Sequence, residues 1–475
     1  MQFHILSFEG PDEYTRAGGI ASRVTGLVRA LADAAYETHL WFVGDPARPG
    51  HESQGSLHLH RWCQWISRYH PSGVYEAEEG KRADYVASLP PFLLREMLLS
   101  YVQNGGHAVI MAEEWHTVDA VLHLDWLLRE AQVRDQVTIL WNANNTFSFH
   151  RIDWRRLAEA AIITTVSRYM KQLMQRWGVN PLVIPNGLPT EALIRPERPA
   201  VAAFRARLRH RTVLCKVARW DPDKRWILAV DILGALKQQG WRPLLIARGG
   251  VEAHGGEVLG AAARAGLRVA ERVFLEPGIH GLLKAMENLE EIDVVNLRSA
   301  ITLPPRRVLF HAASAVLANS GHEPFGLVGL ETMAVGGVAC TGCSGEDYAV
   351  PGYNALVLET NDPREFTALF DELHADPLRE RGLRRAGSAT AKQYMWSEII
   401  QHLLLPRIHF LAKRAAVSAP EASPRASQAR PRPRPRLLQD ESMPPQLAEW
   451  LAERLKRRRT SREDGTLAHV AIVKR

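Results

Sequence analysis

The sequence predicts an α/β protein made of two Rossmann-like domains. Three observations support this class. Short apolar runs alternate with segments of helical periodicity, a turn-forming stretch interrupts the alternation once, and the same alternation then resumes for a similar length. Such alternation is typical of parallel β-α-β units. With 475 residues, 46% of them hydrophobic, the chain has material for about two to three domains with buried cores.

The first domain is expected to span residues 1–190. Its clearest helix runs from Ile20 to about Asp33, where the apolar residues share one face. The segment Ile184–Gly187 then breaks the pattern, because proline and Asn-Gly are turn formers, and it marks the domain boundary. The expected strands are Phe3–Ser7, Thr38–Val43, His107–Ala112, Val137–Trp141, Ile162–Val166 and Pro181–Ile184.

The second domain is expected over residues 191–395, followed by a last helix over residues 396–414 that begins at Trp396. Helices are expected at Trp226–Gln239, Pro305–Ala313 and Gly326–Val335. The expected strands are Val213–Ala218, Pro243–Ala247, Arg272–Leu275, Asp293–Leu297, Ala315–Asn319, Val338–Thr341 and Ala355–Leu358.

Residues 415–475 have a different composition and predict a disordered, basic tail. The alternating Pro-Arg run at 431–436 cannot form a core. A short amphipathic helix with Trp450 and Leu451 on its apolar side precedes the basic run Lys456–Arg459, a combination that suits peripheral contact with an anionic membrane. A solvated extension is the other interpretation. Under both, the tail is dispensable for chemistry.

Charge, cysteine content and the amino terminus restrict the class of protein further. Much of the net charge of +7 lies in the tail, so no nucleic-acid partner is expected. The four cysteines are too few for a disulfide framework, and Cys340 and Cys343 are expected to be ordinary thiols. The chain starts without a basic leader and contains no long apolar run, which predicts a cytoplasmic protein.

The stretch from Ser320 to Glu331 is the strongest indication of chemistry, because it follows an expected strand and opens a helix. If Glu323 and Glu331 lay on one continuous helix, their backbones would be about 12 Å apart. This is about the distance from the sugar to the ribose in a nucleotide sugar. Free amides at the helix start and Gly326 would let a diphosphate approach. The alternative is a helix with an acidic cap and one surface glutamate.

Two further segments carry groups suited to phosphate. Arg219 and Lys224 lie in a turn after an expected strand, where α/β folds bind ligands, and their charges would neutralise a leaving diphosphate. The alternative is a solvated basic turn. Gly18 and Gly19 precede the first helix and would allow close approach of a phosphate or sugar, although Gly-Gly alone is also an ordinary turn.

Together these segments resemble the retaining glycosyltransferases of family 4, relatives of bacterial glycogen and starch synthases with the GT-B fold of two domains and a cleft between them. The resemblance covers roughly residues 1–411. It rests on the glycine loop, Thr165-Val166-Ser167, Ile184-Pro185-Asn186-Gly187, the Arg219/Lys224 pair and the Glu323/Glu331 motif with its Pro-Phe-Gly.

The resemblance implies roles for individual residues. Glu323 would contact the transferred sugar, Glu331 the ribose, and Arg219 with Lys224 the diphosphate. The helix from Trp396 would cross back to the first domain. The anomeric configuration would be retained through front-face attack with the leaving phosphate as base, and neither metal nor cofactor would be required. Further donor-binding residues would be Gly18, Gly19, Asn186, Phe325, Gly326 and Leu327.

The chain departs from the synthases on the acceptor side. Their His-Asp-Trp-His segment reads Glu113-Glu114-Trp115-His116 here, and the histidine credited with contacting the sugar is absent near Asn142 and Asn144. Either asparagine would offer a hydrogen bond but no proton. His116 is a candidate catalytic residue on the acceptor side, or a buried core histidine.

We therefore expect transfer of glucose or a similar hexose from a nucleoside diphosphate sugar to an unidentified hydroxyl acceptor. Three alternatives stay open: a glycogen or starch synthase-type glucosyltransferase, a sugar-nucleotide epimerase of the same fold, and a catalytically silent binding module.

Overall fold

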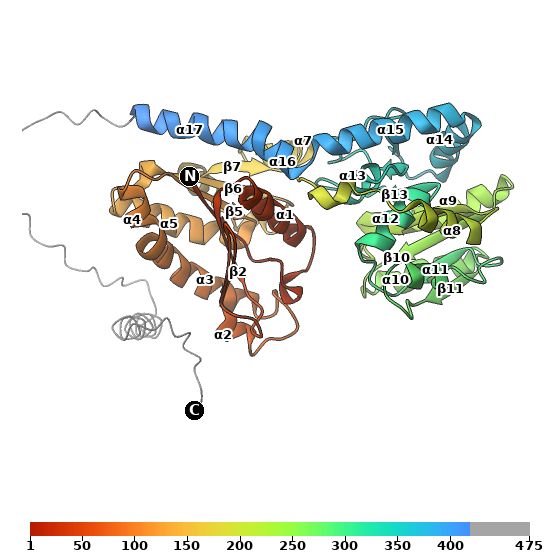
Figure 1. The fold of residues 1–475 in the computed structure, drawn as a ribbon, viewed down its shortest axis with the longest axis horizontal. Helices are drawn as coiled ribbons and strands as arrows, with labels where there is room; N and C mark the ends of the chain where they lie inside the picture. The colour runs from red at the N-terminus through yellow and green to blue at the C-terminus, as the bar shows by residue number, and fades with distance from the viewer. Residues whose placement is uncertain (419–475) are drawn as a thin grey trace, which may run out of the picture.

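The computed structural model describes residues 1–418, and the surroundings of side chains through residue 412. Two lobes, each built around one mainly parallel sheet, lie side by side along the long axis of the molecule (Figure 1). This arrangement confirms the predicted two-domain α/β class. The expectations that fall on residues 419–475, namely disorder and the amphipathic helix, lie outside the described residues.

The first lobe contains an eight-stranded sheet in the order β3-β4-β2-β1-β5-β6-β7-β8. All neighbouring strands pair in parallel except β3 and β4, which are antiparallel. The strands are β1 Gln2–Leu6, β2 Glu37–Val43, β3 His51–Gln54, β4 Leu57–Trp62, β5 Ala108–Glu113, β6 Val137–Ala143, β7 Ile162–Thr165 and β8 Leu182–Val183. The sequence did not predict β3 and β4, because polar and histidine side chains replace the apolar run expected of a strand.

Helices cover both faces of this sheet. Helix α1 and the carboxyl-terminal helices enclose one apolar cluster that includes Phe3, Leu27 and Trp396. On the opposite face α3 and α5 enclose another, around Tyr85 and Leu124. The helices of the lobe are α1 Gly19–Asp33, α2 Gln64–Ser67, α3 Glu78–Phe92, α4 Leu99–Gln103, α5 Val118–Glu130, α6 Trp154–Ala160 and α7 Arg168–Gln175.

The second lobe contains a seven-stranded sheet in the order β11-β12-β10-β9-β13-β14-β15. The expected strand Arg272–Leu275 is wrong: β11 ends at Arg272, and Val273 and Leu275 are mostly exposed. Cys340 is buried in β14, Cys343 is exposed, and both are free thiols. The strands are β9 Thr212–Val217, β10 Pro243–Arg248, β11 Val269–Arg272, β12 Val294–Leu297, β13 Ala315–Ala318, β14 Ala339–Thr341 and β15 Leu356–Val357.

One α-helix lies between each pair of consecutive strands from β9 to β14, and three of these, α9, α12 and α13, correspond to the predicted helices. The helices of the second lobe are α8 Arg198–Arg207, α9 Trp226–Gln238, α10 His254–Arg264, α11 Gly278–Ala285, α12 Leu303–Ala312, α13 Leu327–Ala334, α14 Pro363–Ala375 and α15 Pro377–Gln393. No helix among residues 1–418 combines the length and the apolar character that crossing a membrane would require.

The chain passes between the lobes twice, and the two passages pair with each other. The amide of Leu188 donates to the carbonyl of Tyr394 (2.8 Å), and the amide of Trp396 donates to the carbonyl of Leu188 (3.0 Å). Helix α16 (Trp396–Ile399), the π-helical turn η8 (Ile400–Leu404) and α17 (Leu405–Ser418) then run along the first lobe (Figure 1). The last helix thus extends past the expected end at residue 414.

Two glycines allow the indole of Trp396 to dock at this passage. A Cβ on Gly26 would lie 2.3 Å from its Nε1, and a Cβ on Gly187 would lie 2.5 Å from its Cδ2. Because such distances are far below van der Waals contact, a larger residue at either position would push the crossing segment off the first lobe.

Candidate active site

The two lobes are joined by hydrogen bonds between loops that follow their strands. The Tyr169 hydroxyl lies 2.8 Å from His322 Nδ1, and the amide of Arg168 donates to Asp347 Oδ2 at 2.7 Å. Arg168 and Tyr169 begin α7 directly after β7, whereas His322 follows β13 and Asp347 follows β14. The carboxyl ends of both sheets therefore meet here, at the edge where α/β folds bind ligands.

Lys224 and Glu323 form an ion pair at this edge. Lys224 Nζ donates to Glu323 Oε2 at 2.7 Å, and about one fifth of each side chain is exposed. The loops that carry them are tied together, because the amide of Gly321 donates to the carbonyl of Asp223 (2.7 Å). The structure thus brings together two residues that the sequence had singled out 99 positions apart.

A second carboxyl group, which the sequence analysis missed, lies behind Glu323. Glu346 is buried, and burial together with the charge of Glu323 raises its pKa to about 8. Its Oε2 lies 3.4 Å from the hydroxyl of Ser344, which also accepts the Glu323 amide at 2.9 Å. A neutral Glu346 therefore supports the Glu323 loop without adding charge to it.

The reason for glycine at position 326 differs from the expected one. Gly326 has φ +81°, and a Cβ there would lie 2.6 Å from Glu346 Cγ and 3.1 Å from the Tyr348 hydroxyl. The glycine is required by this left-handed backbone and by the packing of two side chains. Its proposed role in admitting a diphosphate rests on the backbone amides alone.

Glu323 and Glu331 do not lie on one continuous helix, so the predicted spacing of about 12 Å between their backbones is wrong. Helix α13 starts only at Leu327, and Gly326 caps it in a left-handed conformation. Glu331 Oε1 lies 3.4 Å from an Arg306 nitrogen, and burial raises the pKa of Glu331 although Arg306 opposes the shift. Arg306, on α12, is a neighbour that the sequence did not indicate.

Three further predicted donor residues differ in exposure: one side chain is buried, one is partly exposed and one is exposed. Phe325 is buried against Tyr348 and Tyr394, with ring centroids 5.7 and 6.0 Å apart, so any contact it makes with a donor is through its main chain. Leu327 begins α13 and is partly exposed. The Arg219 side chain is exposed and forms no ion pair or hydrogen bond within residues 1–418, which leaves its charge available for an anion.

In the first lobe, a carboxylate already occupies the amides of the glycine loop. Glu9 Oε2 accepts from the amides of Gly18 (3.1 Å) and Ala21 (3.0 Å), and Glu9 Oε1 accepts from the Tyr75 hydroxyl (2.6 Å). Burial raises the pKa of Glu9. Gly18 and Gly19 themselves have open space beside them. Glu9 carried no sequence signal, and a donor phosphate at this helix start would compete with it.

His116 lies beside Tyr75, the residue that donates to Glu9. Its ring stacks on Phe8 at 4.4 Å and lies 5.5 Å from the Tyr75 ring, and Nε2 is 2.6 Å from Glu78 Oε1. Burial lowers the pKa of His116 although Glu78 opposes the shift, so the ring is neutral and donates from Nε2. Its buried Nδ1 has no hydrogen-bond partner within the described residues, which leaves a lone pair for a hydroxyl group.

Asn186 belongs to a buried polar network rather than to an open binding surface. Its Oδ1 accepts from Arg23 Nη1 at 2.7 Å, and Arg23 Nε donates to both oxygens of Glu113 at 3.0 and 3.1 Å. Asn142 and Asn144 both donate to Glu113 Oε2, at 2.9 and 2.8 Å. Both amides therefore hold Glu113, and the Asn144 Oδ1 is left buried without a partner in the described chain.

Lys216 is a further buried group that the sequence analysis missed. Its Nζ donates to the carbonyl of Leu317 (3.0 Å) and to Asn319 Oδ1 (2.8 Å). Burial lowers its pKa to about 7. Because Asn319 begins the loop that leads to Glu323, Lys216 holds the start of that loop from strand β9.

A cavity of about 710 Å³ lies elsewhere in the second lobe. Its wall includes Arg195, Arg381, Arg384, Arg385 and Lys392. None of the predicted donor residues lines it. The candidate active site is therefore the edge with Lys224 and Glu323, which the two lobes share.

Two mainly parallel sheets whose carboxyl ends meet, with a final helix that returns to the first lobe, define the GT-B fold. Solved structures of this fold agree along most of the chain. Sucrose-phosphate synthase from Thermosynechococcus elongatus has 19% identity and a TM-score of 0.60, covering 87% of this chain and 100% of that one. The catalytic domain of starch synthase IV from Arabidopsis thaliana, bound to ADP and acarbose, has 14% identity and a TM-score of 0.61, covering 87% and 99%.

Similarity in sequence is more local. A D-inositol 3-phosphate glycosyltransferase from Pseudarthrobacter chlorophenolicus is 31% identical over 118 residues, which is 24% of this chain and 28% of that protein. The matched segment thus spans less than a third of the relative's length. No model of a known protein family matches the chain.

Proposed function

We propose that the protein is a retaining glycosyltransferase of family 4, which transfers a hexose from a nucleoside diphosphate sugar to a hydroxyl acceptor. The Lys224–Glu323 pair, 2.7 Å apart where the two lobes meet, carries the proposal. The name of the relative supports glycosyl transfer, and the ADP in the starch synthase structure supports a nucleoside diphosphate sugar as the donor. They leave the acceptor unidentified.

In the proposed reaction, the bond between the anomeric carbon and the donor phosphate breaks and a bond to the acceptor oxygen forms on the same face. The acceptor proton passes to the departing phosphate oxygen. Lys224 and the exposed Arg219 neutralise the charge that develops on the nucleoside diphosphate. Glu323 accepts hydrogen bonds from the sugar hydroxyls, and Lys224 moves from Glu323 toward the phosphate when the donor binds.

On the acceptor side, we propose His116 and Glu9 as the groups nearest the acceptor hydroxyl. His116 offers a buried lone pair at Nδ1, and Glu9 with Tyr75 lies across the start of α1.

On the donor side, Glu331 and its neighbour Arg306 would hold the ribose.

The test is release of nucleoside diphosphate by the purified full chain from a panel of UDP-, ADP- and GDP-hexoses, first without acceptor and then with candidate acceptors. D-Inositol 3-phosphate belongs in the acceptor panel because a relative carries that name. Retention is read from the anomeric proton coupling of the product. Donor conversion without release of nucleoside diphosphate would indicate an epimerase, and donor binding with neither reaction would indicate a silent module.

A further inference from the structure

Five histidines, together with Glu37 and Ser53, form a row along one face of the first sheet. The register pairs His4 with His39, His39 with His58 and His58 with Ser53, across β1, β2, β4 and β3. Two residues further along β4, His60 pairs with Trp41 and His51. Because side chains two apart share a face, all of these project from the same side of the sheet.

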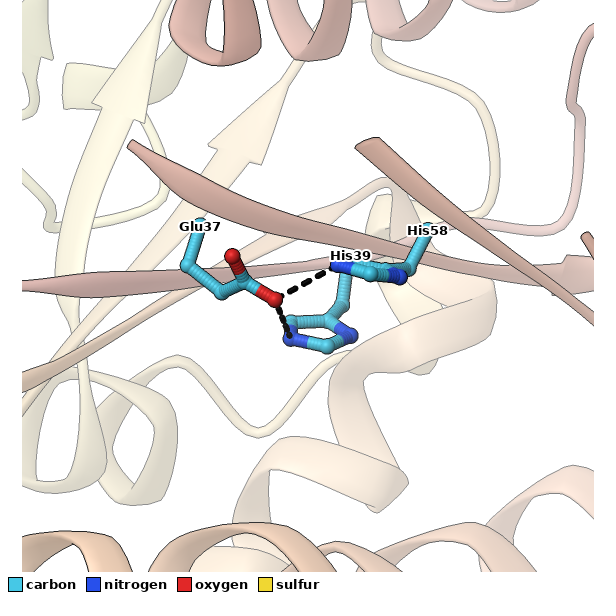
Figure 2. Close-up of side chains that lie close together, drawn as sticks. All are labelled: Glu37, His39 and His58. Carbon is cyan, nitrogen blue, oxygen red and sulfur yellow. Dashed lines mark ion pairs between the residues drawn. The ribbon is translucent and has the colours of Figure 1, made fainter. Parts of the chain in front are cut away.

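Within this row Glu37, His39 and His58 converge on one point (Figure 2). Their ligand atoms all lie within 4.8 Å of one another. Glu37 Oε1 is 2.5 Å from His58 Nε2 and 3.9 Å from His39 Nε2. The shorter contact lacks hydrogen-bond geometry, so His58 Nε2 is a buried nitrogen with no hydrogen-bond partner among the described residues.

The surrounding hydrogen bonds determine which nitrogen of His39 carries the lone pair. The Trp41 indole can only donate, so His4 accepts at Nδ1 (3.2 Å) and donates from Nε2 to Gln2 Oε1 (3.3 Å). The Gln2 amide nitrogen, which can only donate, lies 3.0 Å from His39 Nε2. His39 therefore accepts at Nε2, the atom that faces Glu37.

The other nitrogen of His39 is supported from behind. His39 Nδ1 donates to His60 Nε2 at 3.0 Å, which is the kind of outer contact that holds a metal-bound imidazole in orientation. The Ser53 hydroxyl lies 2.8 Å from His58 Nδ1, and its oxygen can accept a proton from that nitrogen. His58 then presents a lone pair at Nε2 as well.

We propose that Glu37, His39 and His58 form a binding site for a divalent first-row transition ion, with zinc as the best match. Two imidazole nitrogens and one carboxylate are a common ligand set for such ions, and water completes the coordination. A bound ion would replace the Gln2 amide proton on the His39 lone pair.

The position of this site argues for a structural ion. Glu37 and His39 lie at the amino-terminal start of β2, whereas Glu9 and His116 lie beyond the carboxyl ends of β1 and β5 in the same lobe. An ion here would link β2 to β4, the strand beside the antiparallel edge strand β3. The transfer reaction, which is expected to need no metal, is placed at the carboxyl ends of the strands and does not involve this site.

The test uses untagged full-length protein, because a histidine tag would bind the same ions. After dialysis against a chelator, Zn²⁺ alone is titrated by calorimetry, and Co²⁺ alone is followed by visible absorption. We expect one ion per chain and the strong absorption bands of four-coordinate cobalt. Since loss of an outer-shell contact already costs about 10- to 100-fold in affinity, His58→Gln and Glu37→Gln should each weaken binding at least about tenfold.

The matched control is His280→Gln, since His280 and Glu276 form an exposed His–Glu pair (3.3 Å) in the second lobe and contribute to no three-residue metal cluster found among residues 1–418. It should bind zinc as the unaltered protein does. Glu37 is about half exposed, so its substitution tests the site even if His58→Gln disturbs folding, which far-UV circular dichroism would reveal. Absence of stoichiometric binding, or unchanged affinity in both Glu37→Gln and a folded His58→Gln, would overturn the proposal.

Discussion

The ammonium group of Lys224 and the carboxylate of Glu323 lie 2.7 Å apart although they belong to different loops of the second lobe. In the absence of a donor, each neutralises the other. A donor must therefore exchange this contact for one between Lys224 and its phosphate, which makes the pair a direct test of the proposed reaction.

We predict that Lys224→Ala lowers turnover with the best donor by about 100- to 1,000-fold, because a charge-stabilising contact to the leaving group is lost. Steady-state release of nucleoside diphosphate measures the effect. Lys284→Ala is the control, since Lys284 forms an exposed pair with Glu276 at 3.2 Å. Turnover within a factor of two of the unaltered enzyme would reduce Lys224 to a surface cation.

Removal of Arg23 should destabilise the first lobe strongly. Its partner Glu113 is fully buried, so Arg23→Met would leave a carboxylate without a counter-charge in the core, at a cost of about 3–5 kcal/mol in the free energy of unfolding. Urea denaturation followed by tryptophan fluorescence measures this. Arg268→Met, which removes an exposed pair with Glu291, should leave the denaturation midpoint unchanged. Equal midpoints for the two variants would contradict the structural role of the network.

Glu346 should cause activity to fall at alkaline pH. Its pKa is raised to about 8 from 4.5, so between these values the folded protein keeps a proton that the unfolded chain releases. The stabilisation from that proton is lost as the pH rises through about 8, and a second charge then appears beside Glu323.

Glu346→Gln stays neutral and should therefore retain activity at pH 9 relative to pH 7, in a profile of turnover against pH. Glu257→Gln, at an exposed position of α10, is the control and should keep the alkaline decline of the unaltered enzyme. An identical decline in Glu346→Gln would assign the alkaline limb to another group.

The histidine row should make the metal-free protein sensitive to acid. Burial lowers the pKa of His39 to about 3 and that of His60 to about 2, from 6.5. As the pH falls below about 6.5, the unfolded chain takes up protons that the folded protein does not, so the free energy of unfolding decreases down to about pH 3. The neighbouring groups are His4, His51, His58 and Glu37.

His60→Phe, which keeps an aromatic ring against Trp41, should reduce the slope by up to about 1.4 kcal/mol per pH unit. Urea denaturation in the presence of a chelator, repeated from pH 7 to pH 4, provides the measurement. The exposed His280→Gln serves again as the control. An unchanged slope in His60→Phe would show that the acid sensitivity arises outside this row.

Much of the fold could be predicted because parallel β-α-β units are recorded in local periodicity. Nearly all central strands, and the predicted helices α1, α9, α12 and α13, lie where apolar spacing indicated them, whereas the long helices α3, α5, α14 and α15 were not predicted. The missed strands β3 and β4 and the displaced β11 lie at or beside sheet edges, where polar and charged side chains interrupt the apolar pattern. Local spacing also misled for Glu323 and Glu331, because a left-handed glycine ends the loop before the helix begins.

The sequence by itself determined that Arg219, Lys224, Glu323 and Glu331 follow strands that end at one edge of the second sheet, since motif and periodicity are both local. Only the tertiary structure decided which groups they meet. Separate elements of the fold meet in each case: Glu346 with the Glu323 loop, Glu9 with the glycine loop, Lys216 with Asn319, and Glu37 and His39 with His58. Strand register and loop packing set these contacts, and both depend on how the whole core closes rather than on any one stretch of sequence.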